Sequence, residues 1–197
     1  MLEKDKFLEK TKHIIVCIIV FFSHSLVAQN IQTNLINYNK SLKNTSSLFI
    51  QSNGKSIEEG VIYFGIDRIK IDYTEPKKLT IILSERKGVY INHELKESQY
   101  FNTNKSYVKF FFNIFNKNKI NEASNIVVSE NIIELKESFS LNDIFYEIRI
   151  IYENEPIKLR KIIVLENSDS FEMGFFGHNN IENLEQRFFS MADPYLN

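Results

Sequence analysis

The histidine, cysteine and paired acidic residues of this chain are the side chains that could support catalysis or metal binding. Beyond the first 28 residues only two histidines occur, His93 and His178, and they lie in unrelated turns. A metal site needs ligands clustered at set spacings, and the sequence has no such cluster. The neighbouring acids Glu58 and Glu59 fit the solvated end of a strand better than a general acid and base. No G-x-S-x-G, P-loop or G-x-G-x-x-G motif occurs. We therefore expect no enzyme, no metal and no cofactor.

Regularly spaced apolar side chains are the stronger signal in this sequence. Ile69, Ile71 and Tyr73 alternate with Lys70 and Asp72. This period of two puts the three apolar residues on one face of a strand. Such a face covers either a closed core or a cavity kept for a guest molecule, and the alternation alone fits both.

Phenylalanines are concentrated at residues 106–117, and their spacing predicts a helix there. Phe111 and Phe115 lie one helical turn apart and so share one side, with Phe112 beside them. The helix is either part of a core or a movable lid whose aromatic rings fill a cavity until a ligand enters. The polar residues expected to face water are Asn113, Asn116 and Lys117.

Alternation with a period of two recurs along the chain and predicts an antiparallel sheet. An amphipathic helix is predicted first, over residues 31–42. About ten short strands follow in sequence order, separated by turn signals such as Asn53-Gly54, and the last strand is predicted at residues 186–194. A sheet of this length buries one face and curls. The expected fold class is mainly β with helices (α+β).

The first 28 residues have the order of a secretory signal peptide. A stretch with four lysines precedes nine apolar residues, Ile14 to Phe22, and small residues end at Ala28. Nine apolar residues are about half of the ~20 that span a bilayer. Cys17, the only cysteine, lies inside this segment. We therefore expect a signal peptide at 1–28 and one mature domain, without a thiol, at 29–197.

The charge of the chain argues against nucleic acid as a partner. The formal net charge is −1 at pH 7, although a quarter of the residues are charged. Proteins that bind nucleic acid neutralise phosphates with an excess of lysine and arginine. We therefore expect no nucleic-acid partner.

Four stretches of the chain, taken in order, match the pattern of a known family. Phe49-Ile50-Gln51 stands for a strand ending in Phe-x-Gln, and "IKIDYTEP" stands for Phe-Arg-Trp-x-Tyr-x-x-Pro. "IILSERKGVYI" keeps Ser84 and Lys87 of a Ser-Asp-Gly-Lys turn, and "QRFFSMADP" stands for a closing Phe-x-Phe-x-x-Pro. With the mid-chain helix between them, these stretches resemble the periplasmic outer-membrane lipoprotein carrier family, LolA, over nearly all of residues 29–197.

The resemblance implies a fold, a function and a set of site residues. The sheet would form an incomplete β-barrel whose open concave face is covered by the N-terminal and mid-chain helices. Acyl chains of a lipoprotein would lie between them, against Phe49, Ile69, Ile71, Tyr73, Phe111, Phe112 and Phe115. The family usually has Arg-Pro before its Phe-Arg-Trp strand, and the arginine is thought to latch the lid. This chain has no proline there, and Arg68 is the candidate latch.

The resemblance also implies partners and a compartment. A monomer in the periplasm would receive acylated lipoproteins from an inner-membrane exporter and deliver them to an outer-membrane receptor. Two alternatives stay open on the sequence. The chain could be a related half-barrel that binds another lipid or envelope molecule, or an envelope regulator whose sheet binds a protein.

We predict cleavage of the precursor after Ala28, because the small residue ends the segment that follows the apolar run. N-terminal sequencing of protein extracted from the cell envelope measures the mature start. An intact Met1 on membrane-bound protein would contradict both the cleavage and a carrier that moves through water.

Overall fold

The computed structural model describes residues 30–117, 119–120, 124–167, 169–182 and 184–196. The chain divides into two units, residues 1–35 and 36–197. In the first unit the described residues, 30–35, are helical. In the second unit residues 36–41 are helical and precede the sheet. The predicted signal peptide, residues 1–28, lies outside the described residues.

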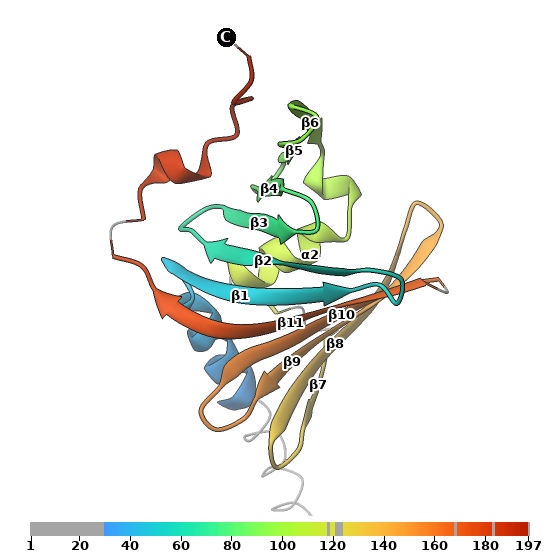
Figure 1. Ribbon diagram of the computed structural model, residues 1–197. Helices are drawn as coiled ribbons and strands as arrows, with labels where there is room; N and C mark the ends of the chain where they lie inside the picture. The colour runs from blue at the N-terminus through green and yellow to red at the C-terminus, as the bar shows by residue number, and fades with distance from the viewer. Residues whose placement is uncertain (1–29, 118, 121–123, 168, 183, 197) are drawn as a thin grey trace, which may run out of the picture. The chain divides into compact units, whose positions relative to one another are not determined.

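The described residues form eleven antiparallel strands in one sheet (Figure 1). β1 to β6 are one meander and β7 to β11 another, and the pairing of β1 with β11 joins them. β6 and β7 lie at the two edges, so the sheet is not closed. The strands are β1 (Thr45–Ser52), β2 (Ile57–Phe64), β3 (Ile69–Glu75), β4 (Leu79–Leu83), β5 (Gly88–Asn92), β6 (Glu97–Phe101), β7 (Asn125–Val128), β8 (Ile132–Leu141), β9 (Ile144–Glu153), β10 (Lys158–Glu166) and β11 (Asp169–Asn180). The predicted fold class is confirmed.

Alternating side chains give the sheet an apolar inner face. On β9, Tyr146, Ile148, Ile150 and Tyr152 are buried, whereas the residues between them are partly exposed. The register carries this inner face across the sheet, because Ile150 is opposite Ile162 on β10 and Ile162 is opposite Met173 on β11. Burial of this face supplies the main apolar stabilisation of the sheet.

Two helical segments of the second unit pack on the inner face. α2 (Val108–Phe115) follows a 3₁₀ helix, η1 (Thr103–Lys105), and buries Phe112, Ile114 and Phe115. Residues 36–41 attach to β9 and β10 through a tyrosine pair. The Tyr38 hydroxyl accepts a hydrogen bond from the Leu159 amide at 2.8 Å, and the Tyr38 ring meets the Tyr152 ring edge-on at 5.8 Å.

The C-terminal strap, residues 184–196, is not the predicted strand. It contains a 3₁₀ helix, η2 (Gln186–Phe189), and it packs on the outer face of the sheet. Phe189 forms a buried cluster with Ile82, Val89 and Ile91 of β4 and β5. The prediction of a strand was wrong because the apolar residues of the strap cover this outer patch instead of continuing the alternation of the sheet.

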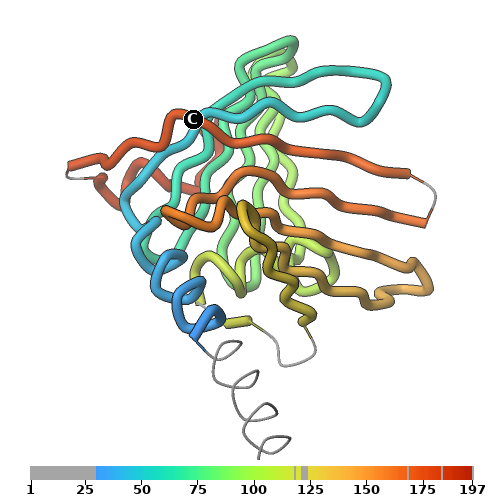
Figure 2. Tube along the Cα trace, turned by 90° about the horizontal axis from the view of Figure 1, so that it is seen from below, coloured from blue at the N-terminus to red at the C-terminus, as the bar shows by residue number. Residues whose placement is uncertain are grey.

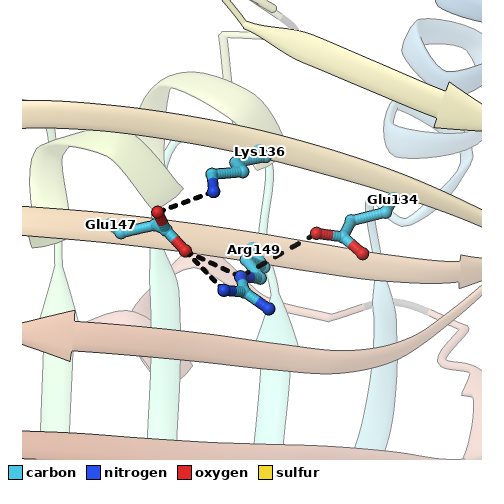
Figure 3. Close-up of polar contacts among 4 residues, drawn as sticks. All are labelled: Glu134, Lys136, Glu147 and Arg149. Atoms are coloured by element: carbon cyan, nitrogen blue, oxygen red, sulfur yellow. Dashed lines mark hydrogen bonds and ion pairs between the residues drawn. The ribbon is translucent and has the colours of Figure 1, made fainter.

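A cluster of four charged residues lies on the face of β8 and β9 opposite the buried tyrosines (Figure 3). The carboxylate of Glu147 accepts from Lys136 Nζ at 2.7 Å and from Arg149 Nη2 at 2.6 Å, and Arg149 also lies 3.9 Å from Glu134. Hydrogen bonds from Lys136 and Arg149 lower the pKa of Glu147 below its ordinary value. The ionised form of Glu147 is therefore favoured in the folded protein.

This cluster predicts a loss of stability at low pH. Because the folded-state pKa of Glu147 is lowered, its contribution is present above the unfolded-state pKa and is lost as pH falls through the folded value. We expect Glu147→Gln to lower the free energy of unfolding at pH 7 by about 1 kcal/mol or less. The difference between the variant and the unmodified protein should shrink as pH falls below the ordinary carboxylate range. Urea unfolding across pH measures it, and a difference that grows on acidification would contradict the assignment.

Candidate ligand cavity

A cavity of about 320 Å³ lies between α2 and the inner face of the sheet. Its floor is made by isoleucine and leucine side chains of three adjacent strands. They come together because Ile71 is opposite Ile62 on β2 and Ile81 on β4, whereas Ile69 is opposite Leu83. The floor residues are Ile62, Ile69, Ile71, Ile81 and Leu83.

The remaining walls come from β6, β10, β11 and α2. Ile162 and Met173 face the cavity from the neighbouring pair β10 and β11. From α2, Val108, Phe111 and Phe115 close the side opposite the floor. Their spacing of three and four residues places them on one side of the helix. An apolar ligand in this space would touch branched aliphatic side chains on one side and aromatic rings on the other.

Polar side chains occur at one end of the cavity. The Tyr73 hydroxyl donates to Gln51 Oε1 at 3.0 Å, and Gln51 Nε2 donates to Glu58 at 3.0 Å. Burial raises the pKa of Tyr73, so the phenol stays neutral. Burial also raises the pKa of Tyr107 to about 12, with a further contribution from the charge of Glu166. Because these phenols are uncharged, they do not disfavour an apolar chain at this end of the cavity.

A second, polar pocket of about 260 Å³ adjoins the cavity, and Asn53 and Phe171 line both. Its lining residues come from the β1–β2 turn and from β10 and β11. Figure 2 shows these segments at the same end of the sheet. Lys55, Glu166 and Asp169 give its lining charges of both signs. An apolar compartment thus opens beside a polar one.

The N-terminal end of α2 is held by aromatic contacts. The Tyr107 ring lies 5.5 Å from the Tyr146 ring and 5.8 Å from the Phe171 ring, and Phe110 reaches Phe139 at 6.2 Å. These contacts connect the start of α2 to β8, β9 and β11. Aromatic pairs at such distances add attraction beyond the area that they bury.

The C-terminal end of α2 is held by Asn116. Its Nδ2 donates to the carbonyl oxygens of Gly65 and Ile66, at 3.4 and 3.3 Å, in the β2–β3 turn. The expectation that Asn116 faces water was wrong, because only 7% of the residue is exposed and its amide instead binds these two carbonyls. Nearby, the Phe115 ring lies 5.5 Å from the Phe64 ring.

Most of the candidate site residues from the sequence meet at this cavity. Ile69, Ile71, Tyr73, Phe111 and Phe115 line it. Their role in binding acyl chains stays a prediction.

Phe49 and Phe112 lie beside the cavity without lining it. Phe112 is a buried residue of α2, and only 2% of it is exposed. The Phe49 and Tyr73 rings meet edge-on, with their centroids 5.1 Å apart, and the Phe49 ring occupies the space beside Gly60. A Cβ at Gly60 would lie 2.1 Å from the backbone oxygen of Asp72 and 2.7 Å from the Phe49 ring, so only glycine fits at this position.

Arg68, the candidate latch, contacts the strap and not α2. Its Nη1 donates to the backbone carbonyl of Phe189 at 2.5 Å. The hydrogen bonds between the end of α2 and the β2–β3 turn come instead from Asn116. Its amide donates to two backbone carbonyls of the turn.

Several lining residues were not singled out from the sequence. Ile62, Ile81, Leu83, Ile162 and Met173 follow the inward alternation of their strands. That alternation is visible in the sequence, but which inward residues lie under α2 depends on strand register and curvature. Within the described residues, no group of three or more His, Cys, Asp and Glu is placed to hold a metal ion. No helix in that part of the chain is long and apolar enough to cross a membrane.

Comparison with solved structures supports the fold. An uncharacterised conserved protein from Thermus thermophilus superposes with a TM-score of 0.54 at 6% identity, over 85% of this chain and 96% of that protein. The complex of Pseudomonas aeruginosa MucA and MucB gives a TM-score of 0.47 at 8% identity, over 82% of this chain and 60% of the matched chain. LprF from Mycobacterium bovis gives a TM-score of 0.37 at 8% identity, over 81% of this chain and 96% of that protein. Of these three, the first exceeds 0.5, and at such low identity it shows the fold alone.

No protein-family model matches the sequence, and no curated protein matches it. The resemblance to the lipoprotein carriers therefore remains a hypothesis from residue patterns. The structure adds a fold that is shared with the Thermus thermophilus protein, and the geometry of the cavity.

The two neighbouring phenylalanines of α2 give a matched test of the cavity. Phe111 is partly exposed to the cavity and Phe112 is buried outside it. We expect Phe112→Ala to lower the free energy of unfolding by roughly 3–5 kcal/mol. Phe111→Ala should cost roughly 1–2 kcal/mol and increase the fluorescence of an apolar dye bound in the enlarged cavity. Chemical unfolding and dye titration measure the two effects. Equal stability losses, with no change in dye binding, would mean that Phe111 belongs to a closed core.

Proposed function

We propose that this protein is a carrier of acylated molecules in the cell envelope and encloses an acyl chain in the cavity under α2. The observation that carries the proposal is the apolar cavity itself, closed by α2 on one side and adjoined by a polar pocket at one end. This arrangement suits an amphiphile whose chain leaves water while its polar end stays hydrated.

The energetics favour an escort for such a molecule. Burying an acyl chain gains ~0.8 kcal/mol per methylene, so about a dozen methylenes gain roughly 10 kcal/mol against water. A lipid chain therefore does not cross an aqueous compartment alone at a useful rate. A carrier that must displace its own side-chain contacts recovers less than this value, which lets the cargo pass to a tighter acceptor.

α2 is the element that we propose moves. It has eight residues. It is held by three buried side chains, by ring contacts, by the two bonds of Asn116 and by an ion pair between Lys117 and Glu85 just after its end. The strands of the cavity floor are held by ladders of backbone hydrogen bonds on both sides. Elements with fewer cooperative contacts open at lower free energy than the sheet that they cover.

The sequence supports a specific setting for this carrier. From the signal peptide predicted at residues 1–28 and the LolA-like residue pattern, we propose that the mature protein works in the periplasm. Its cargo would be acylated lipoproteins, received from an inner-membrane exporter and passed to an outer-membrane receptor. The protein would do no covalent chemistry and need no cofactor.

A charge placed in the cavity tests this proposal. Ile71→Glu puts a carboxylate on the cavity floor, and Ile163→Glu puts the same group on the outer face of β10, where Ile163 is opposite Arg149. Both isoleucines are partly exposed, so both variants should fold. We expect Ile71→Glu to weaken binding of an acylated lipopeptide at least about tenfold because the carboxylate must be desolvated, whereas Ile163→Glu should bind normally.

Fluorescence titration with an acylated lipopeptide measures the affinity of each variant, and circular dichroism verifies folding. Equal binding by the two folded variants would contradict the cavity as the acyl site. Mature protein recovered from the envelope with a protein partner and without acylated molecules would favour the regulator instead.

A further inference from the structure

We propose that the site takes one acyl chain, of about twelve carbons, from an amphiphile whose zwitterionic headgroup lies in the polar pocket. The inference rests on the proposed carrier of acylated molecules, and it names a single-chain amphiphile as a ligand beside the proposed acylated lipoproteins. It is carried by the size of the cavity, the attachments of α2 and the charges beside the cavity.

The volume limits the number of chains. A cavity of about 150 Å³ lined by apolar side chains holds one benzene molecule, about six carbons. The cavity under α2 has about 320 Å³, or room for about twice as many carbons. Two or three acyl chains of that length exceed this space. A ligand with several chains would have to displace α2.

Displacing α2 would break contacts at both of its ends. At one end the Tyr107 ring packs on Phe171 and Tyr146. At the other end Asn116 binds the β2–β3 turn, and Phe115 packs on Phe64. A single chain requires only that α2 open and return. Several chains would keep α2 displaced for as long as they stay bound. The free energy of the broken contacts would then weaken the binding of such a ligand.

The polar pocket determines which end of the ligand lies where. Asn53 and Phe171 line both compartments, so a chain in the cavity leads directly into the polar pocket. Glu166 lines the polar pocket together with Phe171, and the Phe171 ring lies 5.8 Å from the ring of Tyr107, which lines the cavity. The carboxylate of Glu166 therefore belongs to the pocket that adjoins the cavity. Glu166 and Asp169 suit an ammonium, and Lys55 suits a phosphate. A headgroup with both charges fits this lining better than a simple carboxylate.

Three lipid probes separate the alternatives, each used below its aggregation concentration with the mature protein. Lauroyl lysophosphatidylethanolamine has one chain and a zwitterionic head, dilauroyl phosphatidylethanolamine has two chains and the same head, and lauric acid has one chain and an anionic head. We expect one lysolipid per protein in native mass spectrometry. By calorimetry it should bind about tenfold more tightly than either of the other probes.

A variant pair tests the headgroup. Glu166→Gln removes a carboxylate from the polar pocket, and Glu172→Gln removes one that pairs with Lys161 on the outer face. Glu166→Gln should weaken the lysolipid several-fold and leave lauric acid unchanged or slightly tighter. Glu172→Gln should change neither. Equal effects of the two variants would overturn the headgroup assignment.

The outcomes separate this inference from the carrier function. If the two-chain lipid binds as tightly as the lysolipid, the single-chain proposal is wrong and the carrier function stands. If lauric acid binds best, the zwitterionic headgroup is wrong. If the mature protein binds none of the probes, the single-chain proposal fails. If it then also fails to bind an acylated lipopeptide, the carrier function fails with it.

Discussion

The central constraint on this structure is that an open sheet has an apolar inner face larger than its helices fill. Within the described residues the sheet has eleven strands and ends at β6 and β7, so it does not close on itself. α2 contributes only eight residues to covering the inner face, and a cavity of about 320 Å³ remains between them. Apolar surface left unfilled loses packing contacts and invites an apolar ligand. The attachments of α2, the polar pocket and the proposed function all depend on this incomplete filling.

The apolar residues on the two faces of the sheet are covered in different ways. On the outer face of β4 and β5, Ile82 and Val89 are sealed by Phe189 of the strap, which Arg68 fastens through a backbone carbonyl. On the inner face, Ile71 and Ile81 face a space that α2 only encloses. The same alternation that makes a strand therefore yields a closed core on one face and a ligand compartment on the other, depending on what packs against it.

Sequence patterns predicted the strands well because their alternation is a local property. Ile69, Ile71 and Tyr73 were placed on one face from spacing alone, and the structure has them lining one cavity. Whether that face was closed core or cavity could not be decided locally, because it depends on how far α2 reaches across the sheet. Asn116 looked like a solvated helix end, yet the β2–β3 turn, about fifty residues earlier, supplies its partners. The strap was mistaken for a strand because Phe188 and Phe189 are apolar, and only the tertiary structure shows which patch they cover.

The account depends most directly on where an acyl chain lies in the protein. A fatty acid with a nitroxide near its methyl end, added to protein with labelled isoleucine methyl groups, locates the chain by paramagnetic broadening. The account predicts stronger broadening of the signals from Ile62, Ile71 and Ile81 on the inner face than of those from Ile151 and Ile163 on the outer face. Broadening centred on Ile151 and Ile163, or spread evenly over both faces, would contradict it.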